Sequence, residues 1–143
     1  MSGGVRLLDP SRVRLGLEAG SREEAVDAAV ALLRDDPRIT SWDTFRASVG
    51  PKQVVDLEGC GGVILAHGRS AAVKEMALSA ARWEGSGEPR VVFVFAIPAA
   101  MAEEYLRKVG ALARLCREEG RLAALLAATT PEQFASVVED WLA

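Results

Sequence analysis

The sequence predicts a single three-layer α/β domain over residues 1–143, in which a β-sheet lies between layers of helices. The strongest observation is the run Val-Val-Phe-Val-Phe-Ala-Ile at 91–97, which is continuously apolar and rich in β-branched and aromatic residues. Such a run is typical of a strand buried on both faces, in the centre of a sheet. A second apolar run, at 61–66, predicts another buried strand. Stretches with helical spacing of apolar residues precede and follow these two runs.

The composition is that of an ordinary globular protein and excludes several classes of function. The net charge of −3 argues against a nucleic-acid-binding protein, which would normally present a basic face. Cys60 and Cys116 lack the spacing of a metal site or a disulfide framework, so we expect no metal site and a reducing compartment. Because no apolar run approaches membrane-spanning length and the N-terminus lacks a signal-peptide pattern, we expect a cytoplasmic protein without membrane insertion.

The first third of the chain predicts an edge strand followed by two helices. Residues 13–17 alternate apolar side chains with polar or small ones, which suits a half-buried edge strand. Ser21 and Glu24 form a capping box that opens a helix, and Asp-Asp-Pro at 35–37 ends it. A second helix is expected from about residue 40 to 49, because its apolar residues share one side.

The middle of the chain is less clearly patterned. Gly-Pro at 50–51 breaks the second helix, and residues 52–57 favour a short strand. Residues 73–83 alternate weakly, as a strand does, but their alanines would equally suit a helix. The glycine-rich stretch 84–89 predicts a loop.

The last third of the chain predicts three helices. A long helix is expected from Pro98 to about residue 118 or 119, with Leu106 widening its buried face and Gly120 breaking it. A short helix at 121–128 follows. Thr-Pro at 130–131 then supplies an N-cap and a first helical residue for the terminal helix.

The stretch from Gly59 to Arg69, Gly-Cys-Gly-Gly-Val-Ile-Leu-Ala-His-Gly-Arg, is where the sequence indicates chemistry. Its apolar strand delivers the only histidine, His67, to the point where the strand is expected to end and a loop to begin. Ligands of α/β proteins bind at such strand ends. Gly68 removes side-chain bulk beside the ring, and Arg69 adds a permanent cation that can hold an oxyanion. On local pattern alone a lone histidine is more often a surface or packing residue, and Arg46 is most simply a surface arginine.

The segment 62–69, together with Val-Lys-Glu at 73–75, resembles the active-site segment of the enzyme IIA domains of the bacterial phosphotransferase system. The branch that it resembles is the mannitol/fructose and nitrogen-regulatory type. The stretches 87–98, 111–116 and 129–134 resemble later parts of the same family, in the same order, so the resemblance covers nearly the whole chain. It implies a mixed β-sheet flanked by helices on both sides.

The resemblance also implies a reaction. His67 would accept a phosphoryl group from an HPr-type phosphocarrier and pass it to a IIB-type domain, without a metal, nucleotide or other cofactor. Around it, the implied site holds Arg69, Arg46 as the counterpart of a family arginine, Tyr105, and the backbone of Gly62 and Gly68. Tyr105 stands where the family has a second histidine.

Two alternatives to a working phosphoryl carrier remain open. The chain could be a regulatory module that keeps this fold without being phosphorylated and controls a transporter, kinase or other partner. Ala66 in place of the family's proline, Tyr105, and the altered glycine approach at 60–62 favour this reading, whereas the retained His-Gly-Arg opposes it. A small-ligand-binding domain, with His67 merely lining a pocket, is the third possibility.

Overall fold

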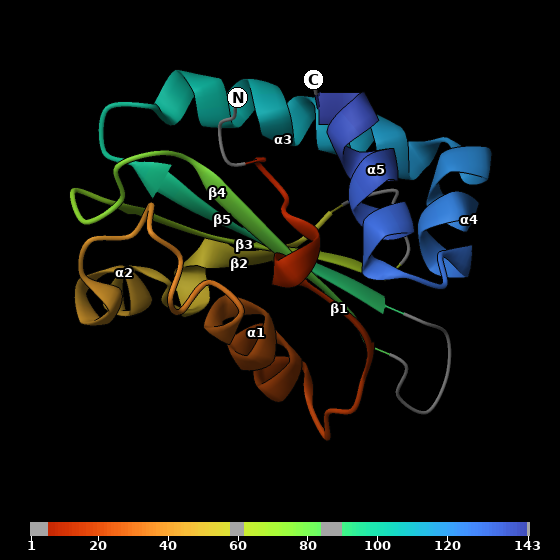
Figure 1. The fold of residues 1–143 in the computed structure, drawn as a ribbon, viewed down its shortest axis with the longest axis horizontal. Coiled ribbons are helices and arrows are strands. Elements are labelled where there is room, and N and C mark those ends of the chain that lie inside the picture. Colours follow the sequence, from red (N-terminus) through yellow and green to blue (C-terminus); the bar gives the residue numbers. More distant parts are fainter. Residues whose placement is uncertain (1–5, 58–61, 84–89, 143) are drawn as a thin grey trace.

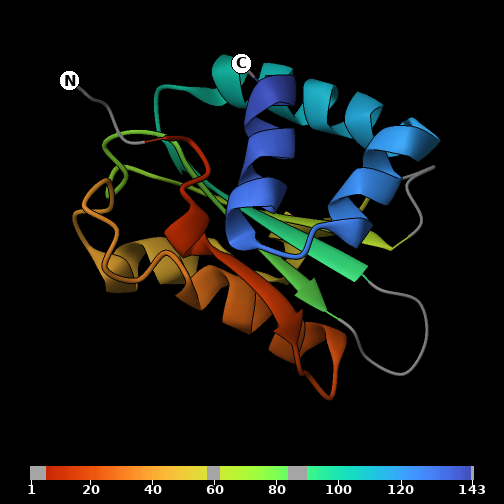
Figure 2. The same ribbon diagram turned by 45° about the vertical axis from the view of Figure 1, so that its right-hand side comes forward.

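Five strands form one sheet between two layers of helices in the computed structural model, which describes residues 6–57, 62–83 and 90–142 (Figure 1). One face of the sheet is covered by α1 (Arg22–Ala31) and α2 (Trp42–Ser48). The other face is covered by α3 (Ala102–Arg117), α4 (Glu119–Ala127) and α5 (Pro131–Leu142), as the turned view in Figure 2 also shows. The predicted three-layer α/β architecture is confirmed.

The sheet is mixed, with the strand order β1-β4-β5-β3-β2. Its strands are β1 (Val13–Leu17), β2 (Val54–Asp56), β3 (Val63–Ser70), β4 (Ala77–Trp83) and β5 (Arg90–Pro98). The pairs β1–β4 and β3–β5 are parallel, whereas β2–β3 and β4–β5 are antiparallel. The continuously apolar run lies in the central strand β5, and β1 lies at an edge, both as the sequence predicts.

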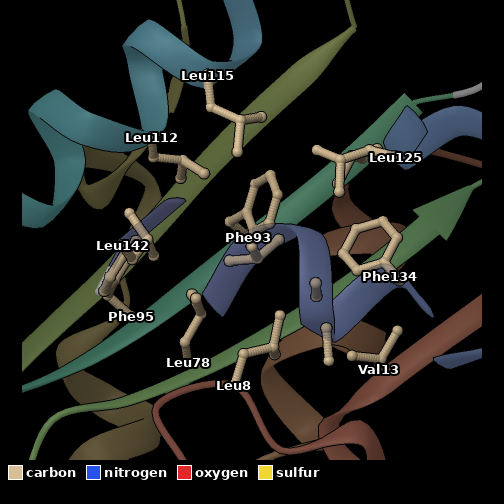
Figure 3. Close-up of a cluster of buried hydrophobic side chains, with 14 of the residues drawn as sticks. Leu8, Val13, Leu78, Phe93, Phe95, Leu112, Leu115, Leu125, Phe134 and Leu142 are labelled. Atoms are coloured by element: carbon tan, nitrogen blue, oxygen red, sulfur yellow. The ribbon is translucent and has the colours of Figure 1, made fainter. Parts of the chain in front are cut away.

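Alternate residues of β5 supply both hydrophobic cores. Phe93 and Phe95 point toward α3–α5, and Figure 3 shows Phe93 among leucines of the covering helices and beside Phe134. Val92 and Val94 point the other way and pack against α1 and α2. This explains why the run shows no polar alternation, since both faces of the strand are buried.

The strand that carries the histidine is longer than the sequence predicts. The sequence predicts that the strand ends at His67, but β3 continues to Ser70. The reason is its parallel neighbour β5, with which residues 67–70 pair in register at 95–98. His67 therefore lies inside a strand, not at its end.

Several element boundaries also differ from the prediction. Residues 77–83 form a strand, because they lie between β1 and β5 in the sheet, which resolves the ambiguity of that stretch. Pro98 ends β5 instead of opening the long helix. The break after that helix falls at Glu118, which has an extended backbone, and Gly120 lies inside α4. The expected loop at 84–89 lies outside the described residues.

The segments 31–37 and 50–57 are also less regular than predicted. The helix α1 ends at Ala31, and turns carry the chain on to Asp35. In the second segment only Val54–Asp56 is strand, and a 3-10 helix, η2 (Pro51–Gln53), precedes it. This short helix becomes important for the site below. None of the described helices is long and apolar enough to cross a membrane.

A buried ion pair fixes the connection between α1 and α2. The Arg38 guanidinium donates to both carboxylate oxygens of Asp36, at 2.8 and 2.6 Å, and to the carbonyl oxygen of Arg6 at 2.8 Å. Arg12 lies 3.3 Å from the same carboxylate. Burial alone would raise the pKa of Asp36, but the hydrogen bonds from Arg38 and the charges of Arg38 and Arg12 together lower it.

Candidate functional site

The side chain of His67 lines an open pocket of about 380 Å³ between β3, α3 and the end of α2. The pocket lies on the face of the sheet that α3 covers, near the edge formed by β2. The residues around it are Ser48, Gln53, His67, Arg69, Ile97, Ala102, Tyr105 and Leu106. Three residues that the sequence singled out are thus brought together: His67, Arg69 and Tyr105.

Strand alternation explains how β3 presents these groups. His67 and Arg69 are two residues apart, so both face the pocket, while Gly68 faces the opposite side. There a Cβ at position 68 would overlap Ser48 Oγ and would lie 2.8 Å from Val49 Cγ2. Gly68 is therefore required by the close approach of α2, and not by crowding beside the imidazole.

Tyr105 packs directly on the imidazole ring. The ring centroids of Tyr105 and His67 are 5.2 Å apart. Tyr105 also packs edge-on against Phe95, with the two ring centroids 5.4 Å apart. Burial raises the pKa of Tyr105 to about 12. The phenol consequently stays protonated at neutral pH and can donate a hydrogen bond to an anion in the pocket.

The two nitrogens of His67 have different surroundings. Nδ1 is buried and, in the part of the chain that the structure describes, has no hydrogen-bond partner, so Nε2 is the nitrogen that a ligand can reach. Burial, and then the charge of Arg69, lower the pKa of His67 from its ordinary value of 6.5. The ring is therefore neutral at pH 7, which is the nucleophilic form of imidazole.

The structure does not bring Arg46 to this pocket. Its guanidinium forms an ion pair with Asp27 at 2.7 Å on the far side of α2, where both line a different pocket. That pocket is shared with Val49 and Pro51.

The two glycines predicted to contact phosphate are placed differently from one another. Gly62 precedes β3, has a positive φ of 81° and accepts a hydrogen bond from the Val91 amide at 2.9 Å. His67 is five residue steps further along the chain, or roughly 16 Å in a strand, and Gly62 is not among the residues that line the pocket. Gly68 adjoins His67, but it is buried in the sheet, paired in register with Ala96. Gly61 and Cys60, the rest of the glycine approach, lie outside the described residues.

Sequence reasoning did not place five of the pocket residues at the site: Ser48, Gln53, Ile97, Ala102 and Leu106. Leu106 was expected to widen the buried face of α3 but is 66% exposed, because the core-facing stripe of that helix runs through Leu112 and Cys116 instead. Gln53 could have been found only from the pairing register of β2 with β3. Across the described ranges, no three carboxylate, histidine or cysteine side chains gather in a way that could hold a metal ion.

Comparison with known proteins gives a family match over most of the chain. Residues 6–141 match the family described as "Phosphoenolpyruvate-dependent sugar phosphotransferase system, EIIA 2". The chain is 31% identical over 136 residues to the PTS system 2-O-alpha-mannosyl-D-glycerate-specific EIIABC component of Escherichia coli K12. This match covers 84% of the chain and 20% of the relative, so the chain spans about a fifth of that relative's length.

Solved structures share the fold. The nitrogen regulatory protein IIA-Ntr of Neisseria meningitidis superposes with a TM-score of 0.70 at 22% identity, covering 92% of this chain and 96% of that one. The mannitol-specific cryptic phosphotransferase enzyme IIA CmtB of Escherichia coli superposes with a TM-score of 0.64 at 22% identity, covering 94% and 96%. At these identities the likeness establishes the fold alone.

Proposed function

Because the chain belongs to the EIIA type 2 family of the phosphoenolpyruvate-dependent sugar phosphotransferase system, we propose that it is a phosphoryl carrier whose acceptor is His67. The phosphoryl group comes from an HPr-type phosphocarrier. It then passes to a IIB-type domain, or it signals to a regulated transporter or kinase. The observation that supports this best is the neutral His67 ring, with Nε2 open to a pocket that it shares with the Arg69 side chain.

The transfer follows from the chemistry of a neutral imidazole. His67 Nε2 attacks the phosphorus of the donor phosphohistidine in line, and a new N–P bond forms as the donor's N–P bond breaks. The proton on His67 Nδ1 stays in place. A donor ring that is protonated on its second nitrogen leaves as neutral imidazole, so no net proton transfer is needed.

Two side chains are suited to stabilise the phosphoryl oxygens. Arg69 is exposed, lies on the same strand face as His67, and carries a permanent positive charge. Tyr105 contributes a neutral O–H donor beside the imidazole. We assign no role to Arg46, because its guanidinium is engaged by Asp27 away from the pocket.

The rim of the pocket suits a protein partner. Leu106 is a large apolar side chain, exposed by two thirds, beside a histidine whose donor and acceptor are themselves folded domains in the proposed reaction. We propose that the HPr-type carrier and the IIB-type domain dock over this rim in turn.

The test is intact-mass spectrometry at neutral or alkaline pH after incubation with phosphoenolpyruvate, enzyme I and an HPr-type carrier from the same organism. We expect one acid-labile phosphoryl group on the wild-type protein and none on His67→Gln. Phosphorylation that persists in His67→Gln would move the acceptor elsewhere.

A non-phosphorylated regulatory module is the second candidate. The surroundings of His67 Nδ1 favour this candidate. Attack by Nε2 requires the tautomer with its proton on Nδ1, and no hydrogen bond from the described residues holds the ring in that tautomer. Absence of any phosphorylated species in the same assay, with the carrier shown to be charged, would support this candidate.

A further inference from the structure

Gln53 lines the same pocket as His67, although the two are fourteen positions apart in the chain. The antiparallel register of β2 and β3 pairs Val54 with Ala66, and continuing that register by one residue, into the end of η2, brings Gln53 level with His67. Both side chains line the same pocket. Gln53 therefore faces the imidazole from the edge of the sheet.

One end of the Gln53 carboxamide is already fixed. Its Oε1 accepts a hydrogen bond from the backbone N–H of Gly50 at 2.9 Å, across the single turn of η2. An N–H can pair only with the oxygen end, so the NH2 end is turned away from Gly50. Among the described residues this NH2 group donates to no other atom, which leaves two donors for a ligand.

The two nearby polar side chains from the end of α2, Ser48 at the pocket and Arg46 outside it, are engaged. Ser48 Oγ donates to the carbonyl oxygen of Phe45 at 2.6 Å, so its single proton is in use. Arg46, one helical turn before Gly50, is paired with Asp27. Within the described ranges, Gln53 is thus a group near β2 whose donors are positioned and not used in another hydrogen bond.

We propose that the Gln53 NH2 group donates a hydrogen bond to a phosphoryl oxygen while the phosphorus is transferred to and from His67 Nε2. This makes Gln53 a catalytic residue and rests on the proposed function. Arg69 and Tyr105 approach from β3 and α3, and Gln53 approaches from η2, so the transferring group has donors on three sides. A neutral amide fixed before the reaction needs no reorganisation as charge develops on the oxygens.

The decisive variant is Gln53→Glu. A glutamate keeps the oxygen that accepts from Gly50, but it replaces both donors with a charged oxygen that repels the phosphoryl group. We expect phosphorylation of His67 to slow about a hundredfold in Gln53→Ala, since one lost donor to a developing oxyanion has an effect of this order, and by more than that in Gln53→Glu, where repulsion is added. In Gln53→Ala the loss should fall on kcat, with KM for the HPr-type carrier unchanged.

Gln133 offers a matched control. Its Oε1 accepts from the Thr129 backbone N–H at 2.8 Å, and it lines a separate pocket between α4 and α5. Gln133→Glu therefore introduces the same negative charge at a similarly hydrogen-bonded position away from His67. The phosphorylation rate of this variant should equal that of the wild-type protein.

Stopped-time intact-mass spectrometry measures these rates, and thermal unfolding of each variant verifies the fold. Wild-type phosphorylation at His67 with an undiminished rate in Gln53→Ala or in folded Gln53→Glu would overturn the role of Gln53 and leave the proposed function standing. A wild-type protein that is not phosphorylated by a charged carrier would overturn both.

Discussion

His67 owes its character to the unequal burial of its two nitrogens. The ring packs against Tyr105, and Nδ1 is buried without a hydrogen-bond partner among the described residues, whereas Nε2 is the nitrogen left to face the pocket. Protonation would place a charge in this enclosure and next to Arg69, which is why the neutral ring is favoured. The apolar packing around the ring thus favours the neutral form that the proposed phosphoryl transfer requires.

The pKa of His67 can be measured without ambiguity, because the chain contains one histidine. An NMR titration of the imidazole should give a pKa below 6.5, and Arg69→Gln should raise it without restoring 6.5, since burial is the larger cause. Because the folded-state pKa is depressed, the free energy of unfolding should decrease as pH falls below about 6.5. A pKa at or above 6.5 in the folded protein would contradict this description of the ring.

Tyr105 is equally accessible to measurement, as the only tyrosine. An ultraviolet titration of the phenolate should show little ionisation in the folded protein near pH 10, where an unperturbed tyrosine is half ionised, and a midpoint at about 12. The same chain unfolded in denaturant is the control and should titrate normally. Coinciding folded and unfolded curves would show that the phenol is not buried against His67.

At the scale of elements, the site depends on how closely α2 approaches β3. Gly68 allows this contact, since any side chain there would meet Ser48, Val49 and Phe45. The close approach of α2 places Ser48 at the pocket. It also positions the following helix η2 beside β3, so that Gln53 reaches the same pocket. Gly68 therefore determines how α2 and η2 form one side of the pocket, although its own position faces away from the pocket.

Gly68→Ala should destabilise the fold by about 1–3 kcal/mol, the range for adding a carbon to a filled core, and should slow phosphorylation because α2 must move. Gly110→Ala is the control, because a Cβ at that helical position meets no other atom within 4 Å. It should stabilise the protein by up to about 1 kcal/mol. Chemical denaturation measures both, and equal stabilities for the two variants would refute the packing argument.

At the scale of the whole molecule, the ion pair of Asp36 and Arg38 links three segments that are distant in sequence. Arg38 reaches the carbonyl oxygens of Arg6 and Met76 while it holds Asp36, so the entry to the domain, the α1–α2 connection and the start of β4 meet at one guanidinium. Both side chains are almost fully buried. Such a pair stabilises little by its presence, but the loss of one partner leaves a buried charge unpaired.

Asp36→Asn should therefore lower the free energy of unfolding by about 3–5 kcal/mol, whereas the exposed neighbour variant Asp35→Asn should change it by less than about 0.5 kcal/mol. Because the folded-state pKa of Asp36 is lowered, its contribution is present above about pH 3.8 and is lost as pH falls through the folded-state value. Urea denaturation at neutral pH compares the variants. A small effect of Asp36→Asn would mean that Arg38 finds other partners.

Much of this molecule could be predicted from local pattern, because the relevant physics is local. The apolar run of β5, the Ser21 cap of α1 and the family resemblance around His67 all follow from neighbouring residues, and the family match confirms the last of these. The length of β3 could not be predicted in this way, because it is set by pairing with β5.

The composition of the pocket shows the same division. Gln53 enters it only through the register of β2 on β3, and Leu106 is exposed only because of how α3 is rotated on the sheet. The family resemblance implies that Arg46 is a site arginine, but the orientation of α2 directs the Arg46 guanidinium to Asp27, with which it forms an ion pair. Tertiary placement, which no local pattern encodes, decides each of these.

The most direct test of the central claim is to locate the phosphoryl group on the ring. A long-range proton–nitrogen NMR correlation spectrum of the phosphorylated protein shows the imidazole signals of a single histidine, His67. We predict phosphorus bonded to Nε2 and a proton on Nδ1. Phosphorus on Nδ1, or an unmodified imidazole in protein that carries a phosphoryl group, would contradict the account.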